Sequence, residues 1–298
     1  MAGSGPDILF DIKNAFYLGN WQQCLNEVQK CKVANDEEKL ESDIFMYRAY
    51  IAQKKYGLVL NEINSSKPES LQSVKLFAQY LSQSSASSRS SIVEQIDSNL
   101  DQYTNDPISS LMAATIYYYE QNFDTALKVL NNFSHIECMA LKLQIFLQLD
   151  RFDLARKEYK RMAEKDEYCT LSQLAQAWIN LFCAGEKLQD AFFIFQELKE
   201  KFGSTPLLLN GQACCLIAQG KYQEAEPLVQ ETIDKDPNYT ESIINQMLLA
   251  QYNGKSLEVI NRYLNQLKDD SGIPGNVFLN NYSSKEREFD SIVLQYKV

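Results

Sequence analysis

The sequence predicts an all-α protein, a right-handed superhelical solenoid of about eight to nine helix hairpins. Two observations carry this prediction. The 298 residues include only 11 glycines and 7 prolines, which is sparse for a fold with many short strands and turns. A short motif also recurs about every 34 residues along most of the chain. A regular spacing of this kind indicates stacked repeats that share one continuous core.

The sharpest copy of the motif is Gly220-Lys-Tyr-Gln-Glu-Ala225, and Pro237 follows it. The glycine lets the chain reverse between two helices, and the aromatic ring of Tyr222 fills the space between them. Alanine lets the two helices approach closely. Pro237 is expected to begin the next helix, because proline loses no needed N–H at a first helical position. This pattern is the turn and second helix of a tetratricopeptide repeat.

Weaker copies have an anchor residue at the position of Tyr222, usually aromatic but leucine or serine in two copies. A small or aliphatic residue follows three positions later. Their anchors are Trp21, Tyr56, Phe123, Phe152, Leu188, Ser256 and Phe289. Most neighbouring anchors lie about 34 residues apart, but Tyr56 and Phe123 are separated by nearly two periods. This gap predicts a degenerate repeat near residues 68–104, anchored near residue 89. We therefore expect a solenoid over residues 1–268 and capping helices, continuous with it, over residues 269–298.

The charge and the chemistry-bearing residues exclude several function classes. A net charge of −10 argues against binding to nucleic acid or to an anionic membrane surface. The seven cysteines form no C-x-x-C pair and the single histidine, His135, has no motif around it. The sequence therefore predicts no catalytic residue, no metal site and no cofactor. The sequence also predicts no signal peptide and no membrane-spanning segment, because its start lacks basic and apolar regions and no apolar stretch is long enough.

The inner face of the solenoid is the expected binding surface, because tetratricopeptide arrays generally hold extended peptides or small structural elements there. Aromatic anchors suit such a surface, and one ring of Tyr117-Tyr118-Tyr119 should fill the repeat core. Counting back from each anchor gives the groove candidates Thr115, Tyr118, Tyr119, Gln144, Trp178, Asn210, Cys214 and Tyr252. Each could instead pack against the next repeat, since the count tolerates a slip of one residue.

A basic group on one second helix has two interpretations. Arg151, Arg156, Lys157, Lys160 and Arg161 could dock an acidic segment or a lipid headgroup. Because Asp153 and Glu158 are interleaved with them, a solvated helix face is the simpler interpretation.

Six stretches resemble the epsilon subunits of coatomer, in order and at matching length. They are residues Leu9–Tyr17, Tyr47–Gln53, Leu149–Lys157, Gly185–Phe195, Leu208–Ala213 and Phe289–Tyr296. The resemblance implies a non-catalytic subunit of a coat that forms vesicles at the Golgi and returns cargo to the endoplasmic reticulum. It also implies binding to the C-terminal domain of the alpha coat subunit, with other coat subunits contacted indirectly. The expected location is the cytoplasm, cycling to Golgi membranes and coated vesicles as a peripheral component.

Two other function classes remain open at the level of sequence. A co-chaperone adaptor that clamps a peptide carboxylate needs Lys, Arg and Asn at inner positions of consecutive repeats. The inner positions here are largely uncharged, which favours an apolar protein interface. A repeat subunit of a prenyltransferase would need particular carboxylates or lysines, and no motif marks any.

Overall fold

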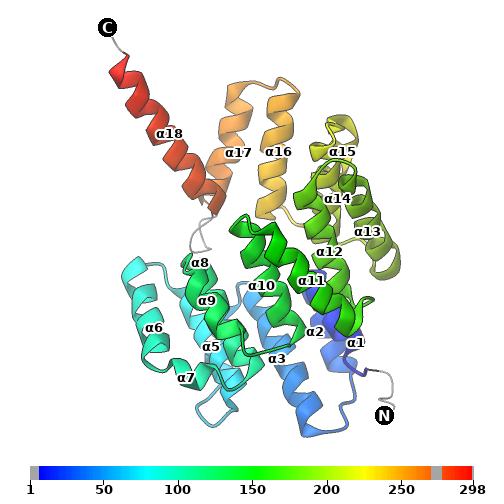
Figure 1. Ribbon diagram of the computed structural model, residues 1–298, viewed down its shortest axis with the longest axis vertical. Coiled ribbons are helices and arrows are strands. Elements are labelled where there is room, and N and C mark those ends of the chain that lie inside the picture. Colours follow the sequence, from blue (N-terminus) through cyan, green and yellow to red (C-terminus); the bar gives the residue numbers. More distant parts are fainter. Residues whose placement is uncertain (1–6, 270–276, 297–298) are drawn as a thin grey trace.

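The computed structural model describes residues 7–269 and 277–296, and within these ranges it contains eighteen helices and no strand. Sixteen of them form eight hairpins (Figure 1). These are α1 (Phe10–Tyr17) with α2 (Trp21–Lys30), α3 (Asp36–Ala52) with α4 (Tyr56–Glu62), α5 (Glu69–Ser82) with α6 (Ala86–Ser98), α8 (Pro107–Tyr119) with α9 (Phe123–Leu130), α10 (Ile136–Gln148) with α11 (Phe152–Asp166), α12 (Thr170–Cys183) with α13 (Lys187–Phe202), α14 (Pro206–Ala218) with α15 (Tyr222–Lys235), and α16 (Thr240–Tyr252) with α17 (Leu257–Asp269). A short α7 (Leu100–Tyr103) follows α6, and α18 (Val277–Gln295) follows α17. The predicted all-α solenoid is confirmed.

The predicted register of the hairpins is confirmed at their turns. Five anchors, Trp21, Tyr56, Phe123, Phe152 and Tyr222, are the first residues of second helices. Two positions before each of these anchors the backbone has a positive φ, at Gly19, Lys54, Gln121, Asp150 and Gly220. The copies at Lys54, Gln121 and Asp150 look weak in sequence because a non-glycine residue occupies this left-handed position.

The degenerate repeat forms a hairpin, α5 with α6. Ser85 caps the start of α6 by accepting a hydrogen bond from the Ser88 N–H. Ile96 is the buried residue of α6, and it belongs to the core cluster that continues through α8. The serine-rich sequence of α6 thus still forms a helix, but the helix contributes little apolar surface to the core.

Two local expectations were wrong. Pro237 lies in the turn before α16, which begins at Thr240, whereas Pro107 and Pro206 do occupy the first positions of α8 and α14. Phe289 lies inside α18 and does not begin a second helix. Lys285-Glu-Arg-Glu288 precede Phe289 and are strong helix formers with no turn residue among them, so the helix continues through the anchor position. The division of the chain at residue 268 remains a prediction.

The first helices of the hairpins close into a ring. Along the chain α1, α3, α5, α8, α10 and α12 each contact the next, and α12 returns to contact α1. Figure 1 shows the first hairpin, in blue, beside α12, in green. Hairpins α14–α15 and α16–α17 continue beyond this ring. The solenoid therefore turns back on itself within its first six hairpins.

Specific contacts fix this closure. Leu18, directly after α1, lies in a buried cluster with Leu174, Phe195 and Leu208 of the sixth and seventh hairpins. The Thr170 hydroxyl donates to Asn14 Oδ1 at 2.5 Å. These contacts join residues more than a hundred positions apart, so no repeat period could reveal them.

Candidate partner-binding site

An ion pair spans the inner side of the ring. Arg48 of α3 donates to Glu137 of α10, and the Tyr17 hydroxyl of α1 donates to the other carboxylate oxygen at 3.2 Å. The Arg48 guanidinium carbon also lies 4.5 Å from the centre of the Phe16 ring. Burial acts to raise the pKa of Glu137, but Arg48 opposes it and holds the pKa below its ordinary value of 4.5. The ring interior thus contains a paired charge that separates two recesses.

The first recess, here called the turn-side recess, lies where the inner helices α3, α5 and α8 end. Its volume is about 370 Å³. The lining residues are Phe16, Trp21, Arg48, Ile51, Ala52, Lys54, Tyr56, Phe77, Leu81, Met112, Thr115 and Tyr119. Most of these side chains are apolar or aromatic, and Phe77 stacks on Tyr119 at 6.3 Å. A surface of this composition suits an apolar segment of a protein partner with few charges.

The second recess, here called the cap-side recess, lies where α10 and α12 begin, and its volume is about 470 Å³. Phe10, Lys13 and Asn14 of α1 line one side, and His135, Lys165 and Thr170 line the other. Lys13 is ion-paired with Asp7 and with Glu41, at 3.0 Å each. Polar and charged side chains make up most of its lining, so the cap-side recess is a less apolar surface than the turn-side recess.

Two of the groove candidates meet in the turn-side recess. Thr115 and Tyr119, one turn apart on α8, both line it. Thr115 donates its hydroxyl to the Leu111 carbonyl at 2.6 Å, which leaves its methyl group for the recess. Burial raises the pKa of Tyr119 to about 12.

The other six candidates lie elsewhere. Tyr118 packs edge-on against Phe123, Gln144 is half-buried on α10, and Trp178 contacts two core clusters. Asn210 is buried and accepts hydrogen bonds from Ser242 and from Asn245. Cys214 is half-buried beside Asn245. Tyr252 is exposed and stacks on Tyr222 with ring centres 4.1 Å apart.

Sequence reasoning missed the residues that the first hairpin brings to the recess. Phe16 and Trp21 line it from α1 and α2, and the Phe16 ring packs edge-on against Trp21 and against Phe45. The only signal in the sequence was the cluster of aromatic residues around the Gly19 turn. The same cluster is equally typical of the core of an ordinary first repeat, so it did not indicate a binding surface.

His135 and the basic group of α11 have structural surroundings. His135 occupies the position before α10, and burial is the largest cause that lowers its pKa from 6.5. Arg151 is ion-paired with Asp153 at 3.0 Å, and Arg161 with Glu158 at 2.9 Å. Arg151, Asp153 and Arg161 are exposed, as on a solvated helix face. Glu158 is instead buried and is also ion-paired with Lys142 of α10 at 2.9 Å, so it belongs to the packing between α10 and α11.

Residues 7–269 and 277–296 hold no group of three or more His, Cys, Asp and Glu side chains that could bind a metal ion. None of the helices in these ranges is long and apolar enough to span a membrane.

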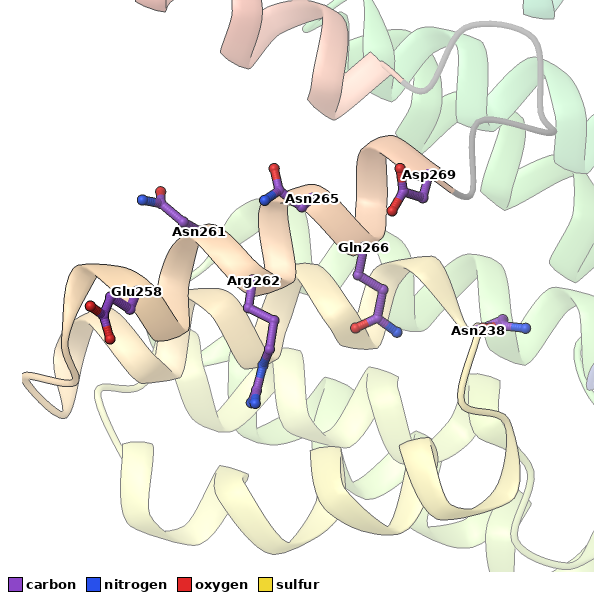
Figure 2. Close-up of a pocket in the computed structure, with 7 residues that line it drawn as sticks. All are labelled: Asn238, Glu258, Asn261, Arg262, Asn265, Gln266 and Asp269. Carbon is purple, nitrogen blue, oxygen red and sulfur yellow. The ribbon is translucent and has the colours of Figure 1, made fainter.

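A third surface lies on the last hairpin (Figure 2). It is a shallow recess of about 790 Å³ along the outer side of α17. The lining residues are Asn238, Glu258, Asn261, Arg262, Asn265, Gln266 and Asp269, all polar. A polar outer face of this kind ends a repeat array, because a further repeat would need apolar surface there.

Comparisons with known proteins agree with this architecture and identify the family. A solved tetratricopeptide repeat protein from Parabacteroides merdae matches the fold with a TM-score of 0.52 at 14% identity, over 88% of this chain and 97% of that one. A sequence model described as "Coatomer epsilon subunit" matches residues 5–297.

Curated relatives match over nearly their whole lengths. The coatomer subunit epsilon of Dictyostelium discoideum is 39% identical, over 88% of this chain and 90% of its own. Coatomer subunit epsilon-1 of Arabidopsis thaliana is 38% identical over 96% of both chains, and the subunit of Caenorhabditis elegans is 33% identical over 96% and 97%. These proteins are structural subunits of a multi-subunit vesicle coat and not enzymes. The chain belongs to the family of coatomer epsilon subunits.

Proposed function

We propose that this coat subunit binds the C-terminal domain of the alpha coat subunit through the inner side of its ring. The turn-side recess is the main contact surface in this proposal. Through this attachment the chain supports Golgi-to-ER retrograde and intra-Golgi vesicle transport. It reaches membranes from the cytoplasm as a peripheral part of the coat, together with the other subunits.

One observation supports the recess as the contact. Among the three surfaces described above, its lining has the largest apolar share, and it gathers aromatic side chains from five helices, α1, α2, α4, α5 and α8. Apolar, aromatic residues are enriched in the buried centres of stable interfaces, whereas the rim is polar. A peptide-carboxylate clamp would need unpaired cations here, but Arg48 is already paired with Glu137.

The test introduces a long cation into the recess. Thr115→Arg places a guanidinium among apolar side chains, and we expect it to weaken binding of the recombinant alpha C-terminal domain by at least about tenfold, or about 1.4 kcal/mol. The matched control is Thr125→Arg on α9, a half-buried threonine on an outer helix that does not line the recess.

Isothermal titration calorimetry measures both affinities, and thermal denaturation checks that both variants fold. Loss of affinity by Thr115→Arg alone supports the proposal. Equal affinity of the two variants, with both folded, would show that the alpha domain binds elsewhere.

A further inference from the structure

The last helix, α18, has a regularly spaced apolar stripe. Phe278, Tyr282, Lys285, Phe289 and Ile292 follow one another at alternating steps of four and three residues, and Tyr296 continues the spacing just past the helix end. This spacing averages 3.5 residues, the repeat with which one helix packs along another. Lys285 is the only charged residue in the stripe, here called the α18 seam.

The α18 seam is exposed. Phe289 is 67% exposed, Ile292 52% and Tyr296 79%. No described residue of α18 is buried, and α18 makes no extensive contact with any other described helix. In Figure 1 it projects from the rest of the molecule. A contiguous apolar surface of this kind on a folded protein marks an interaction site.

The neighbouring end of the solenoid does not offer an apolar surface to receive it. Leu264 and Leu267 of α17 are buried against the hairpin partner. The outer side of α17 presents Asn261, Asn265 and Gln266 instead (Figure 2). Packing the aromatic rings of α18 on these amides would desolvate them without supplying hydrogen bonds. The polar outer side of α17 therefore gives the α18 seam no apolar counterpart at this end of the described array.

Charges on α18 also disfavour pairing between two copies. In a parallel pair, Lys285 of one copy would face Lys285 of the other inside the seam. In an antiparallel pair centred on the seam, Glu286 would face Glu286 and Glu288 would face Glu288 at the flanks. Like charges at these positions select against an oligomeric arrangement. Lys285 and Glu288 lie 2.7 Å apart within one copy. Together they form a charge pattern that a helix with the opposite charges can match.

We propose that α18 docks a single amphipathic helix of another protein. The complementary helix carries apolar residues at heptad spacing, an acidic residue opposite Lys285, and basic residues beside Glu286 and Glu288. The 19 residues of α18 span about 28 Å at 1.5 Å per residue, which accommodates a partner helix of about five turns. A contact of this size is small compared with a stand-alone interface, so it serves as an additional attachment within an assembly.

The first experiment measures charge-matched recognition with the full chain. The probes are two designed 21-residue helical peptides with leucine along the seam. The matched peptide has glutamate opposite Lys285 and lysines at the flanks, and the reversed peptide has these charges exchanged. Fluorescence anisotropy is expected to show at least about tenfold tighter binding of the matched peptide.

The variant Lys285→Glu is expected to reverse or abolish that preference. The control variant Lys268→Glu makes the same charge change on an exposed residue of α17 and is expected to leave it unchanged. Equal binding of the two peptides, or a preference that Lys285→Glu does not alter, would overturn the proposal.

The second experiment identifies the occupant in the assembled coat. A photo-crosslinking amino acid at Phe289, which is exposed, is expected to react with a helix of another subunit that has the complementary pattern. A crosslink to a second copy of this chain, or to its own solenoid, would overturn the proposal. The variant Phe289→Asp tests the two proposals separately. If it still co-purifies with the alpha C-terminal domain, the ring function stands whether or not α18 docks a helix.

Discussion

At the turn between the two helices of a repeat, one residue adopts a positive φ whatever its side chain. Gly220 has φ 74°, and Gln121 and Asp150 have 59° and 56° at the equivalent positions. A residue with a Cβ is strained in this region, whereas glycine enters it freely. The turn geometry is therefore set by the hairpin packing, and glycine makes it less costly without being required.

Gln121→Gly is expected to stabilise the chain by about 0.5–1 kcal/mol, because the relieved strain exceeds the added entropy of the unfolded chain. Gln121 is exposed, so the loss of its side chain removes no core contact. Chemical denaturation measures the change. Gly220→Ala is the converse control and should destabilise by a similar amount. A destabilised Gln121→Gly variant would contradict this account of the turns.

Gly211 has a different role, because it permits a close approach between α14 and α13. A Cβ at this position would lie 2.7 Å from ring atoms of Phe195, which is itself fully buried. Gly211→Ala is therefore expected to destabilise the chain by about 1–3 kcal/mol.

The helical glycine Gly57 supplies the control for Gly211. An added Cβ there meets nothing within 4 Å, so Gly57→Ala should stabilise the protein by up to about 1 kcal/mol. Thermal denaturation of both variants compares them directly. Similar effects at the two glycines would show that α13 and α14 do not pack as closely as described.

At the scale of the element, four of the hairpins have a buried alanine three positions after their anchor. Ala225 is completely buried and packs with Ala213, Leu216 and Val229 between α14, α15 and α16. Ala126, Ala155 and Ala191 are buried at the equivalent positions. The small side chain lets the second helix lie close to the first in these four hairpins.

Ala225→Leu is expected to cost about 1–3 kcal/mol through overpacking, measured by urea denaturation. Glu226→Leu, at the next position of the same helix and exposed, adds a similar side chain without entering the core and should have little effect. An unchanged midpoint for Ala225→Leu would mean that the repeat register is wrong.

Helix boundaries could be predicted from the sequence where the repeat motif follows a turn, and the prediction failed where the motif occurs without one. Tyr56 and Phe123 begin second helices as predicted, and α6 forms inside the gap between them. At Phe289 the same motif falls within a continuous helix, since an aromatic residue and an aliphatic one three positions apart also describe one face of any amphipathic helix. Only the preceding turn distinguishes the two cases.

The buried Arg48–Glu137 pair links elements that the repeat pattern treats as independent. Glu137→Gln is expected to destabilise the chain by about 3–5 kcal/mol, because it leaves the buried Arg48 guanidinium without its counter-charge. The double variant Arg48→Met/Glu137→Leu should recover much of that loss. A double variant as unstable as Glu137→Gln would show that the unpaired charge is not the cause.

The same pair gives a defined dependence on pH. Because the pKa of Glu137 is lower in the folded chain than its ordinary value of 4.5, its contribution is fully present above that value and is lost as the pH falls through the folded pKa. The difference in unfolding free energy between the chain and Glu137→Gln should therefore shrink below pH 4.5. A difference that stays constant down to pH 3 would contradict the assignment.

At the scale of the whole molecule, closure of the ring decides which candidate residues share a surface. Counting from the anchors placed Thr115 and Tyr119 on the inner side, and both line the turn-side recess. The same count included Asn210, which is buried between α14 and α16, and Tyr252, which lies at an outer turn. Phe16 and Trp21 reach the recess from the first hairpin, which packs directly on α3. The same hairpin also contacts the sixth hairpin and so closes the ring, a long-range contact that local periodicity does not encode.

The most direct test of the account is amide hydrogen exchange of the full chain, alone and bound to the recombinant alpha C-terminal domain. Binding is expected to add protection at the ends of α3, α5 and α8, around residues 48–56, 77–81 and 112–119, which contain residues that line the turn-side recess. The outer helices α9, α11 and α13 should exchange at the same rates in both states. Added protection on those outer helices, with none at the recess, would contradict the claim that the inner side of the ring holds the partner.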